Sequence, residues 1–344
     1  MSDVSVGIWD HVERRPGQSL TELYEGRCQF LELADQGPYW CYHVAEHHFT
    51  PLGMAPSPAV YLSALIQRTR RIRLGSLVHL LPLYHPLRLI EEICMLDHMS
   101  GGRLELGFGR GISPFELGHY GTQFLQARDD MEEVLEILIK GLRSEALSHD
   151  SRNYRFRSVP MELRPLQQPN PPLWYGINSE RSLRYAAGMG MNVITGGPNQ
   201  ALAPQASVYR ELWQQAQAEG SSLNPQLKTP RIGAFRLVYV AETDAQAQRK
   251  AREAYPVFYY SLQKLWRDNG AVATQFPPDY DQLAAYDTFI VGSPATVRAQ
   301  TEQFFAETGC NYLLLEFVWG SIGQEESMQS LALYSEAVTG LITA

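Results

Sequence analysis

An acidic residue and two imidazoles, Glu46, His47 and His48, are adjacent in the sequence. They follow residues 39–45, an apolar run of the length of a buried strand, so we expect them at the C-terminal end of that strand. An imidazole placed there can serve as acid, base or hydrogen-bond donor toward a bound ring. Neighbouring residues of an extended segment point to opposite sides, so one histidine can face a site while the other packs behind it. A histidine pair satisfied within a loop is an equally good interpretation.

Metal chemistry has little support in the sequence. A zinc site would need further ligands, and neither a His-x-His nor a His-Glu-x-x-His pattern accompanies the pair, so no metal is predicted. The four cysteines lie far apart without Cys-x-x-Cys spacing. We therefore expect reduced, packed thiols and a reducing compartment.

Two further segments combine glycine with polar residues at the ends of expected strands. Residues 107–111 carry Arg110 between two glycines, and a guanidinium there can bind a phosphate in bidentate fashion. Asn178 is a candidate N-cap of the next helix, with Ser179 and Ser182 in its first turn. A helix N-terminus attracts phosphate, although each segment alone is more often an ordinary turn or cap.

Elements that would position these residues alternate along the chain. Apolar runs typical of strands are separated by segments with helical spacing, and the expected strands cover residues 4–9, 39–45, 72–81, 103–109, 173–177, 192–195, 231–240 and 311–317. Parallel strands need crossover helices, so eight such units predict a (β/α)8 TIM barrel, with a doubly wound open sheet as the alternative. We expect one domain, 1–344, with irregular insertions near 143–172 and 270–290.

Composition narrows the possible partners. The 344 residues carry a net charge of −8 and no long basic run, so nucleic acid is not an expected partner. No run of 18 apolar residues predicts a membrane span, no signal peptide is recognisable, and a cytoplasmic enzyme is expected. Aromatic residues are frequent in 255–290, which fits either a lid over an apolar substrate or ordinary helix packing.

The chain resembles the bacterial luciferase-like flavin-dependent monooxygenases. The resemblance rests on Ala45-Glu-His-His-Phe49, Leu74-Gly-Ser-Leu-Val78, 81–88, 91–103 and Gly107-Phe-Gly-Arg-Gly111, in this order. It is weaker beyond these blocks but extends to residues 174–190 and 309–317. We therefore expect the resemblance to include most of the chain.

The resemblance implies a barrel that binds flavin mononucleotide (FMN), usually as a homodimer or heterodimer. His47 would be the active-site histidine beside the flavin ring. Leu77 and Val78 match a position where the family often has a cis peptide beside that ring. The FMN phosphate would be held by a set of four residues, Arg110, Asn178, Ser179 and Ser182. Luciferase itself has glutamate at the position of Asn178 and cysteine at that of Gly109, and the missing thiol argues against light emission.

The resulting hypothesis is a two-component monooxygenase. Reduced FMN from a separate NAD(P)H-dependent flavin reductase would react with oxygen and oxidise a small organic substrate such as an aldehyde, sulfonate or terpenoid. No dinucleotide-binding fingerprint is visible, which agrees with an external reductase. The alternatives are a deazaflavin-dependent dehydrogenase, a non-catalytic FMN-binding protein and, last, a metal-dependent barrel hydrolase.

Overall fold

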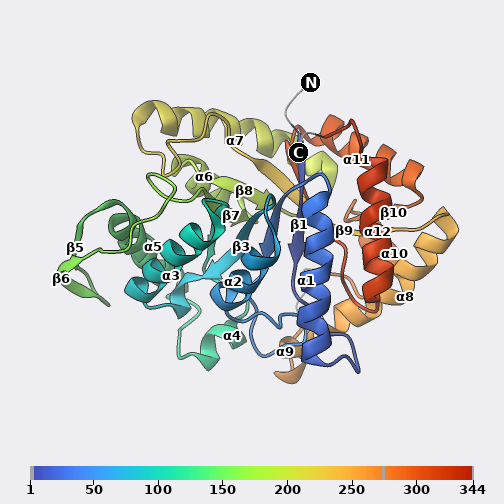
Figure 1. The fold of residues 1–344 in the computed structure, drawn as a ribbon, viewed down its shortest axis with the longest axis horizontal. Coiled ribbons are helices and arrows are strands. Elements are labelled where there is room, and N and C mark those ends of the chain that lie inside the picture. Colours follow the sequence, from blue (N-terminus) through green and yellow to red (C-terminus); the bar gives the residue numbers. More distant parts are fainter. Residues whose placement is uncertain (1–3, 273–275, 343–344) are drawn as a thin grey trace.

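The computed structural model, which describes residues 4–272 and 276–342, contains a closed barrel of eight parallel strands (Figure 1). In order around the barrel these are β1 (Ser5–Asp10), β2 (Tyr39–Val44), β3 (Arg73–Leu80), β4 (Leu104–Gly109), β7 (Leu173–Ile177), β8 (Asn192–Thr195), β9 (Ile232–Val240) and β11 (Tyr312–Glu316). Pairing of β11 with β1 and of β8 with β9 closes the ring. The predicted TIM barrel is confirmed, and the open sheet is wrong.

Helices surround the strands. The long ones are α1 (Leu20–Gln36), α2 (Pro58–Arg68), α3 (Pro86–Ser100), α5 (Ala127–Arg143), α6 (Glu180–Gly188), α7 (Asn199–Glu219), α8 (Asp244–Leu262), α11 (Pro294–Thr308) and α12 (Gln324–Ala337). Local signals explain several starts: Ser19 and Glu22 form a capping box before α1, and α2, α3 and α11 each begin at a proline. Gln263 separates α8 from the short helix α9 (Lys264–Asp268).

Both predicted insertions contain ordered elements. Within 143–172, β5 (Ala146–Asp150) and β6 (Arg155–Pro160) form an antiparallel hairpin, which projects at the left of Figure 1. Within 270–290, α10 (Tyr280–Ala284) leads to β10 (Phe289–Gly292), a ninth strand that the sequence did not predict. It pairs with the second half of β9, beyond the part of β9 that pairs with β8. Residues 273–275 of this insertion lie outside the described residues.

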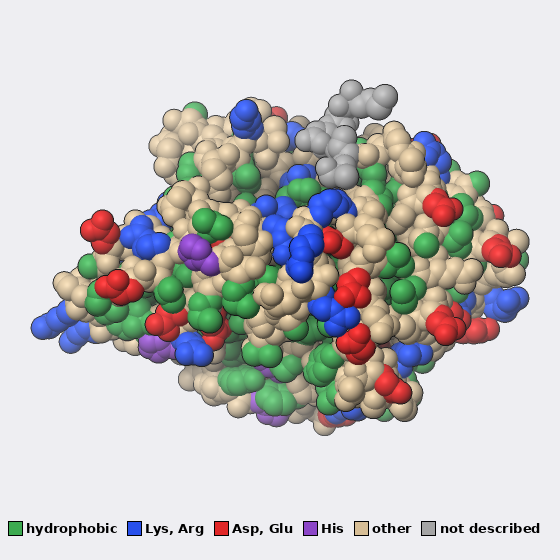
Figure 2. Space-filling model, viewed as in Figure 1, with side chains coloured by type: hydrophobic (Ala, Val, Ile, Leu, Met, Phe, Trp, Pro, Cys, Tyr) green, Lys and Arg blue, Asp and Glu red, His purple; other side chains and the backbone are tan. Residues whose placement is uncertain are grey.

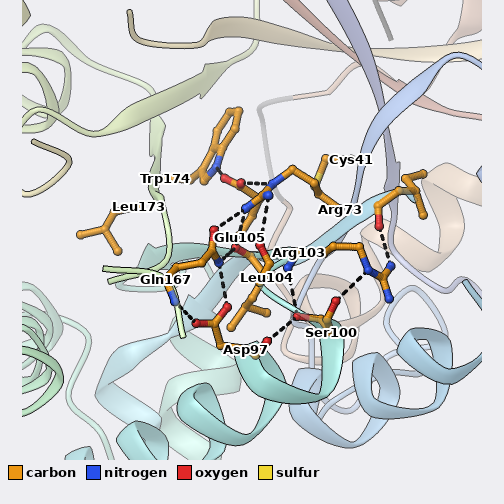
Figure 3. Close-up of polar contacts among 12 residues, drawn as sticks. Cys41, Arg73, Asp97, Ser100, Arg103, Leu104, Glu105, Gln167, Leu173 and Trp174 are labelled. Atoms are coloured by element: carbon orange, nitrogen blue, oxygen red, sulfur yellow. Dashed lines mark hydrogen bonds and ion pairs between the residues drawn. The ribbon is translucent and has the colours of Figure 1, made fainter. Parts of the chain in front are cut away.

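The N-terminal end of the barrel is closed by a buried polar network (Figure 3). Glu105 on β4 is fully buried and accepts hydrogen bonds from Nε of Arg73 and Nε1 of Trp174, each at 2.5 Å. Arg73 also donates to Gln167, whose side chain donates in turn to Asp97. Each charge therefore has a partner, which a buried ion pair requires in order not to destabilise the fold. Networks at this end of a barrel serve stability.

The barrel interior is filled by apolar and aromatic side chains. Leu77, Trp174, Ile194, Tyr312 and Leu314 form one buried cluster inside the ring of strands. A larger cluster joins the outer faces of the strands to the helices. All four cysteines are free and buried, which agrees with the expected reduced thiols.

Surface properties differ between the two barrel ends. The short helices α4 (Pro114–His119) and α9 lie together at the lower edge of Figure 1, where Phe115 and Trp266 pack with ring centroids 5.8 Å apart. Hydrophobic side chains gather at the same edge in Figure 2, whereas charges of both signs are spread over the rest of that face. Within the described part of the chain, no helix combines the length and apolarity needed to cross a bilayer.

Candidate active site

A cavity of about 330 Å³ opens at the C-terminal ends of the barrel strands. We call it the rim cavity, and its volume is typical of small-ligand sites. Six residues predicted from the sequence line it: His47, Leu77, Val78, Arg110, Asn178 and Ser182. Ser179, the seventh, lines a larger adjoining cavity instead. The structure therefore brings together side chains that are spread over more than 130 positions in the sequence.

His47 is held by a carboxylate from a helix that the sequence analysis missed. Nδ1 of His47 lies 3.0 Å from Oε1 of Glu116 on α4, and the Glu116 side chain is 2% exposed. Burial alone would lower the pKa of His47, but the Glu116 carboxylate outweighs it and raises that pKa. Glu116 is in turn stabilised as an anion. Burial alone would raise the pKa of Glu116, but His47 outweighs burial and lowers that pKa. The two form an ion pair beside the cavity.

His48 points away from the rim cavity, as the alternation of side chains predicted. Its Nε2 lies 2.9 Å from Oε1 of Glu46, and its Nδ1 lies 3.0 Å from the hydroxyl of Tyr120. The other carboxylate oxygen of Glu46 accepts from the Tyr84 hydroxyl. One histidine of the pair thus faces the site, and the other fixes the loop that carries it.

A second imidazole faces the same cavity. His11 directly follows β1, and its Nδ1 lies 2.7 Å from Oε1 of Glu316, the last residue of β11. Its ring stacks near that of His47, with centroids 5.5 Å apart and planes 25° apart. Burial, with His47 beside it, lowers the pKa of His11 to about 3. At a pH at which His47 is protonated, His11 is therefore neutral.

The guanidinium groups of Arg110 and Arg128 line the rim cavity, and neither has an ion-pair partner among the described residues. Arg110 lies over the ring of Phe124, 4.6 Å from its centroid. Arg128, in the first turn of α5, hydrogen-bonds the phenol of Tyr175 on β7. Aromatic partners orient both groups without neutralising them, so the positive charge remains available to an anion.

The start of α6 adds backbone donors at the same place. Its N-cap is Ser179 and not Asn178, so that expectation was wrong. Oγ of Ser182 accepts the backbone N–H groups of Asn178 and Ser179 at 3.1 and 3.0 Å. The Ser182 hydroxyl is therefore engaged in the cap, whereas the Asn178 side chain is exposed and has no hydrogen bond with a described residue.

The wall of the rim cavity opposite α8 is formed by β3 and β4. The Leu77–Val78 peptide bond is cis, as the family resemblance implied. Gly109 on β4 lies directly against Val78: a Cβ atom at position 109 would come within 2.5 Å of Cγ2 of Val78. Glycine thus allows the two strands to approach closely at the cavity wall.

An adjoining cavity of about 1330 Å³ lies beside the rim cavity. The two share Asn178, Phe235 and Phe276, so they are contiguous. We call it the side cavity. It is lined by the loop after β8 and by the 276–288 segment, at the place where β10 replaces β8 as the neighbour of β9. In the aromatic segment 255–290, Tyr255 is buried in the core, which agrees with ordinary helix packing, and Phe276 lines both cavities. A lid over a substrate stays a prediction.

Three residues of the site were not predicted from the sequence. Glu116 is preceded by Ser113 and Pro114, and a serine three residues before a glutamate is a helix-start signal that would have located α4. His11 stands at the exit of a predicted strand, as His47 does, so the same reasoning applied there. Arg128 has no comparable signal, because only the packing of α5 against the barrel turns it toward the cavity.

Comparisons with known proteins identify the family of this chain. The model of the family described as luciferase-like monooxygenase matches residues 5–312. The uncharacterized protein y4wF of Sinorhizobium fredii is 36% identical over 95% of this chain and 94% of its own length. The oxygenase component of the flavin-dependent trigonelline monooxygenase of Acinetobacter baylyi is 29% identical over 73% of this chain and 69% of its own.

Solved structures show the same architecture. The crystal structure of monooxygenase RslO1 from Streptomyces bottropensis superposes with a TM-score of 0.81 and 27% identity, covering 97% of this chain and 98% of that one. The chain therefore belongs to the luciferase-like monooxygenase family. It is an oxidoreductase, and its relatives support the flavin-dependent monooxygenase class.

Proposed function

We propose that this enzyme uses reduced FMN and dioxygen to oxidise a small organic substrate in the rim cavity. One observation carries the proposal: Arg110 and Arg128, neither with an ion-pair partner among the described residues, line the cavity that His47 faces together with the N-terminus of α6. A phosphorylated flavin needs positive charge for its anionic tail at one end of the cavity and a protonated imidazole beside its ring at the other. When bound, the reduced flavin supplies the electrons that activate dioxygen.

The residues present fit this cofactor. Arg110 and Arg128 would hold the phosphate through charge-assisted hydrogen bonds, and the exposed Asn178 amide could donate a further one. Ser179 and Ser182 support the same site through the cap, because their mutual hydrogen bonds hold the first turn of α6 in place. The dipole of α6 also favours a negative charge here.

The apolar wall formed by Leu77 and Val78 would contact the flat ring system. His47 would then hold a proton at Nε2 beside the reacting atoms, since Glu116 occupies its Nδ1. A protonated imidazole can donate this proton or a hydrogen bond as negative charge develops. The surrounding Phe258 and Leu262 limit the access of water to that proton.

Reduced flavin would come from a separate NAD(P)H-dependent reductase. The relation to an enzyme named as an oxygenase component supports this division. We further infer a single barrel domain over 1–344, a homodimer and a cytoplasmic location. Light scattering of the purified chain measures the dimer directly.

Binding and oxygen uptake test the proposal. We expect the chain to bind FMN more tightly than riboflavin, because only FMN carries the phosphate, and to consume oxygen when reduced FMN is supplied. A deazaflavin-dependent dehydrogenase would instead prefer the deazaflavin F420 and leave oxygen untouched. Equal affinity for FMN and riboflavin would contradict the phosphate site.

A further inference from the structure

The rim cavity has two chemically different halves, because opposite strands of the barrel carry different side chains. In the ring of eight strands, β1, β11 and β9 lie opposite β7, β4 and β3. Arg110, Asn178 and the Leu77–Val78 peptide all belong to the second half. If FMN occupies that half, as proposed above, the substrate must contact the first half.

This first half is aromatic. Trp9 at the end of β1 and Phe235 on β9 pack edge to face, with centroids 4.4 Å apart. Phe258 from α8 lies beside them, 5.9 Å from the ring of His11. Such walls favour an apolar, ring-containing substrate.

The charges behind these walls are already compensated. Asp10 is paired with Arg27 at 2.8 Å, and both side chains are almost fully buried. Burial raises the pKa of Glu316 well above its usual value of 4.5, and the nearby Asp10 adds to the rise. Burial thus favours the protonated form of Glu316. No uncompensated cation of the described chain remains in this half to bind an anionic substrate.

Besides the indole N–H of Trp9, which is buried without a hydrogen-bond partner, His11 is the polar group that the described residues of this half present to the cavity. Its backbone position is fixed by the end of β1, and its Nδ1 is engaged by Glu316. No described residue hydrogen-bonds Nε2. We assign the buried carboxyl of Glu316, 2.7 Å away, as donor to Nδ1, which leaves the ring N–H on Nε2, facing the cavity.

We propose that His11 binds the substrate: its Nε2–H donates a hydrogen bond to a carbonyl or hydroxyl oxygen on an uncharged, apolar, ring-containing substrate. Glu316 acts through His11 as a positioning residue that fixes the tautomer. The inference rests on the proposed function, because FMN must fill the opposite half. It makes sulfonates poor substrates and cyclic ketones or phenols good ones.

A matched set of ligands tests the inference without any substitution. The FMN-loaded full chain is titrated calorimetrically with 1-tetralone, with tetralin, which lacks the oxygen, and with naphthalene-2-sulfonate. We expect 1-tetralone to bind about tenfold more tightly than either, the value of one hydrogen bond of about 1.4 kcal/mol. A parent chain that binds FMN but shows no such preference overturns this inference alone. A parent chain that does not bind FMN overturns the proposed function as well.

Variants then locate the donor. His11→Phe should abolish the preference for 1-tetralone while FMN affinity is retained, and His11→Gln, which keeps an N–H donor, should restore part of it. His85→Phe, an exposed histidine outside both cavities, is the matched control and should bind like the parent chain. Retention of the full preference in His11→Phe would overturn the assignment.

Glu316 is tested by the difference between two variants. Glu316→Gln keeps a donor to Nδ1 of His11 and should preserve the preference for 1-tetralone. Glu316→Leu removes the donor and should reduce the preference about tenfold without changing FMN affinity. Equal preference in both variants would show that Glu316 does not position His11.

Discussion

His47 and Glu116 are 69 residues apart in the sequence, yet Nδ1 of the imidazole lies 3.0 Å from a carboxylate oxygen of Glu116. The same oxygen accepts the backbone N–H of His48 at 2.9 Å. Glu116 thereby fixes both the ring and the backbone of the histidine loop. The short helix α4 consequently controls the protonation of a group in the loop that follows β2.

This relationship predicts the effect of Glu116→Gln. The glutamine retains the shape but not the charge, so the pKa of His47 should fall, because burial is then opposed only by the smaller effects of Glu46 and Glu316. The ion pair stabilises the fold at pH values below the pKa of His47 and above that of Glu116. A histidine NMR titration of both proteins measures the shift, and an unchanged His47 pKa would contradict the ion pair.

Removal of the unpaired guanidiniums should affect only the phosphorylated cofactor. Arg110→Met and Arg128→Met are each expected to weaken FMN binding by about 1.5–3 kcal/mol, the range for hydrogen bonds to charged groups, and to leave riboflavin binding unchanged. Arg155→Met on the distant hairpin, where Asp150 is the partner, is the control. A parallel loss of riboflavin affinity would show that the arginines support the fold instead of the phosphate.

Glu13 should make stability depend on pH. Burial raises its pKa from 4.5 to about 7, while Oε2 accepts the backbone N–H of Gly320. A carboxyl with a raised pKa stabilises the fold below pH 4.5, and this contribution of about 3 kcal/mol is lost as the pH rises through 7. Glu13→Gln should remove the loss.

Urea unfolding at pH 5 and pH 8 provides the measurement for Glu13. The advantage of the variant over the parent chain should be larger at pH 8 than at pH 5. Glu145→Gln, an exposed exchange, controls for the change in net charge. A constant difference between variant and parent at the two pH values would be inconsistent with a titrating Glu13.

Removing one partner of the ion pair at the N-terminal barrel end should lower the stability of the fold strongly. Arg73→Met leaves Glu105 buried without its partner and should destabilise the fold by about 3–5 kcal/mol. Adding Glu105→Gln should recover part of the loss, because the amide oxygen can still accept from Trp174. Arg68→Met, which breaks an exposed ion pair with Glu25, should cost below about 1 kcal/mol. Similar losses for the Arg68 and Arg73 variants in urea unfolding would contradict this.

The repeating strand and helix patterns were enough to predict the barrel, because both periodicities are local properties of the sequence. Residues at strand ends, such as His47 and Arg110, could be placed for the same reason: parallel strands bring their C-terminal ends together. The sequence did not predict β10 because three apolar residues and a glycine inside an irregular segment show no alternation.

Other parts of the site depend on tertiary packing. The packing of α5 against the barrel decides whether Arg128 points into the cavity. No local sequence pattern predicts this packing. The cap at α6 shows a further limit: Asn178 and Ser179 are both good caps by type, and only the backbone decides between them. Protonation states likewise arise from neighbours distant in sequence, as with His11 and Glu316.

The contact between Gly109 and Val78 constrains how the cavity wall can evolve. Valine is branched at Cβ and rotates little, so it cannot move aside for a new side chain at 109. The two positions must therefore covary: family members with a side chain at the position of Gly109 should carry alanine or glycine at that of Val78. The width of the rim cavity at this wall is thus a property of this pair of residues, and neither can be exchanged independently.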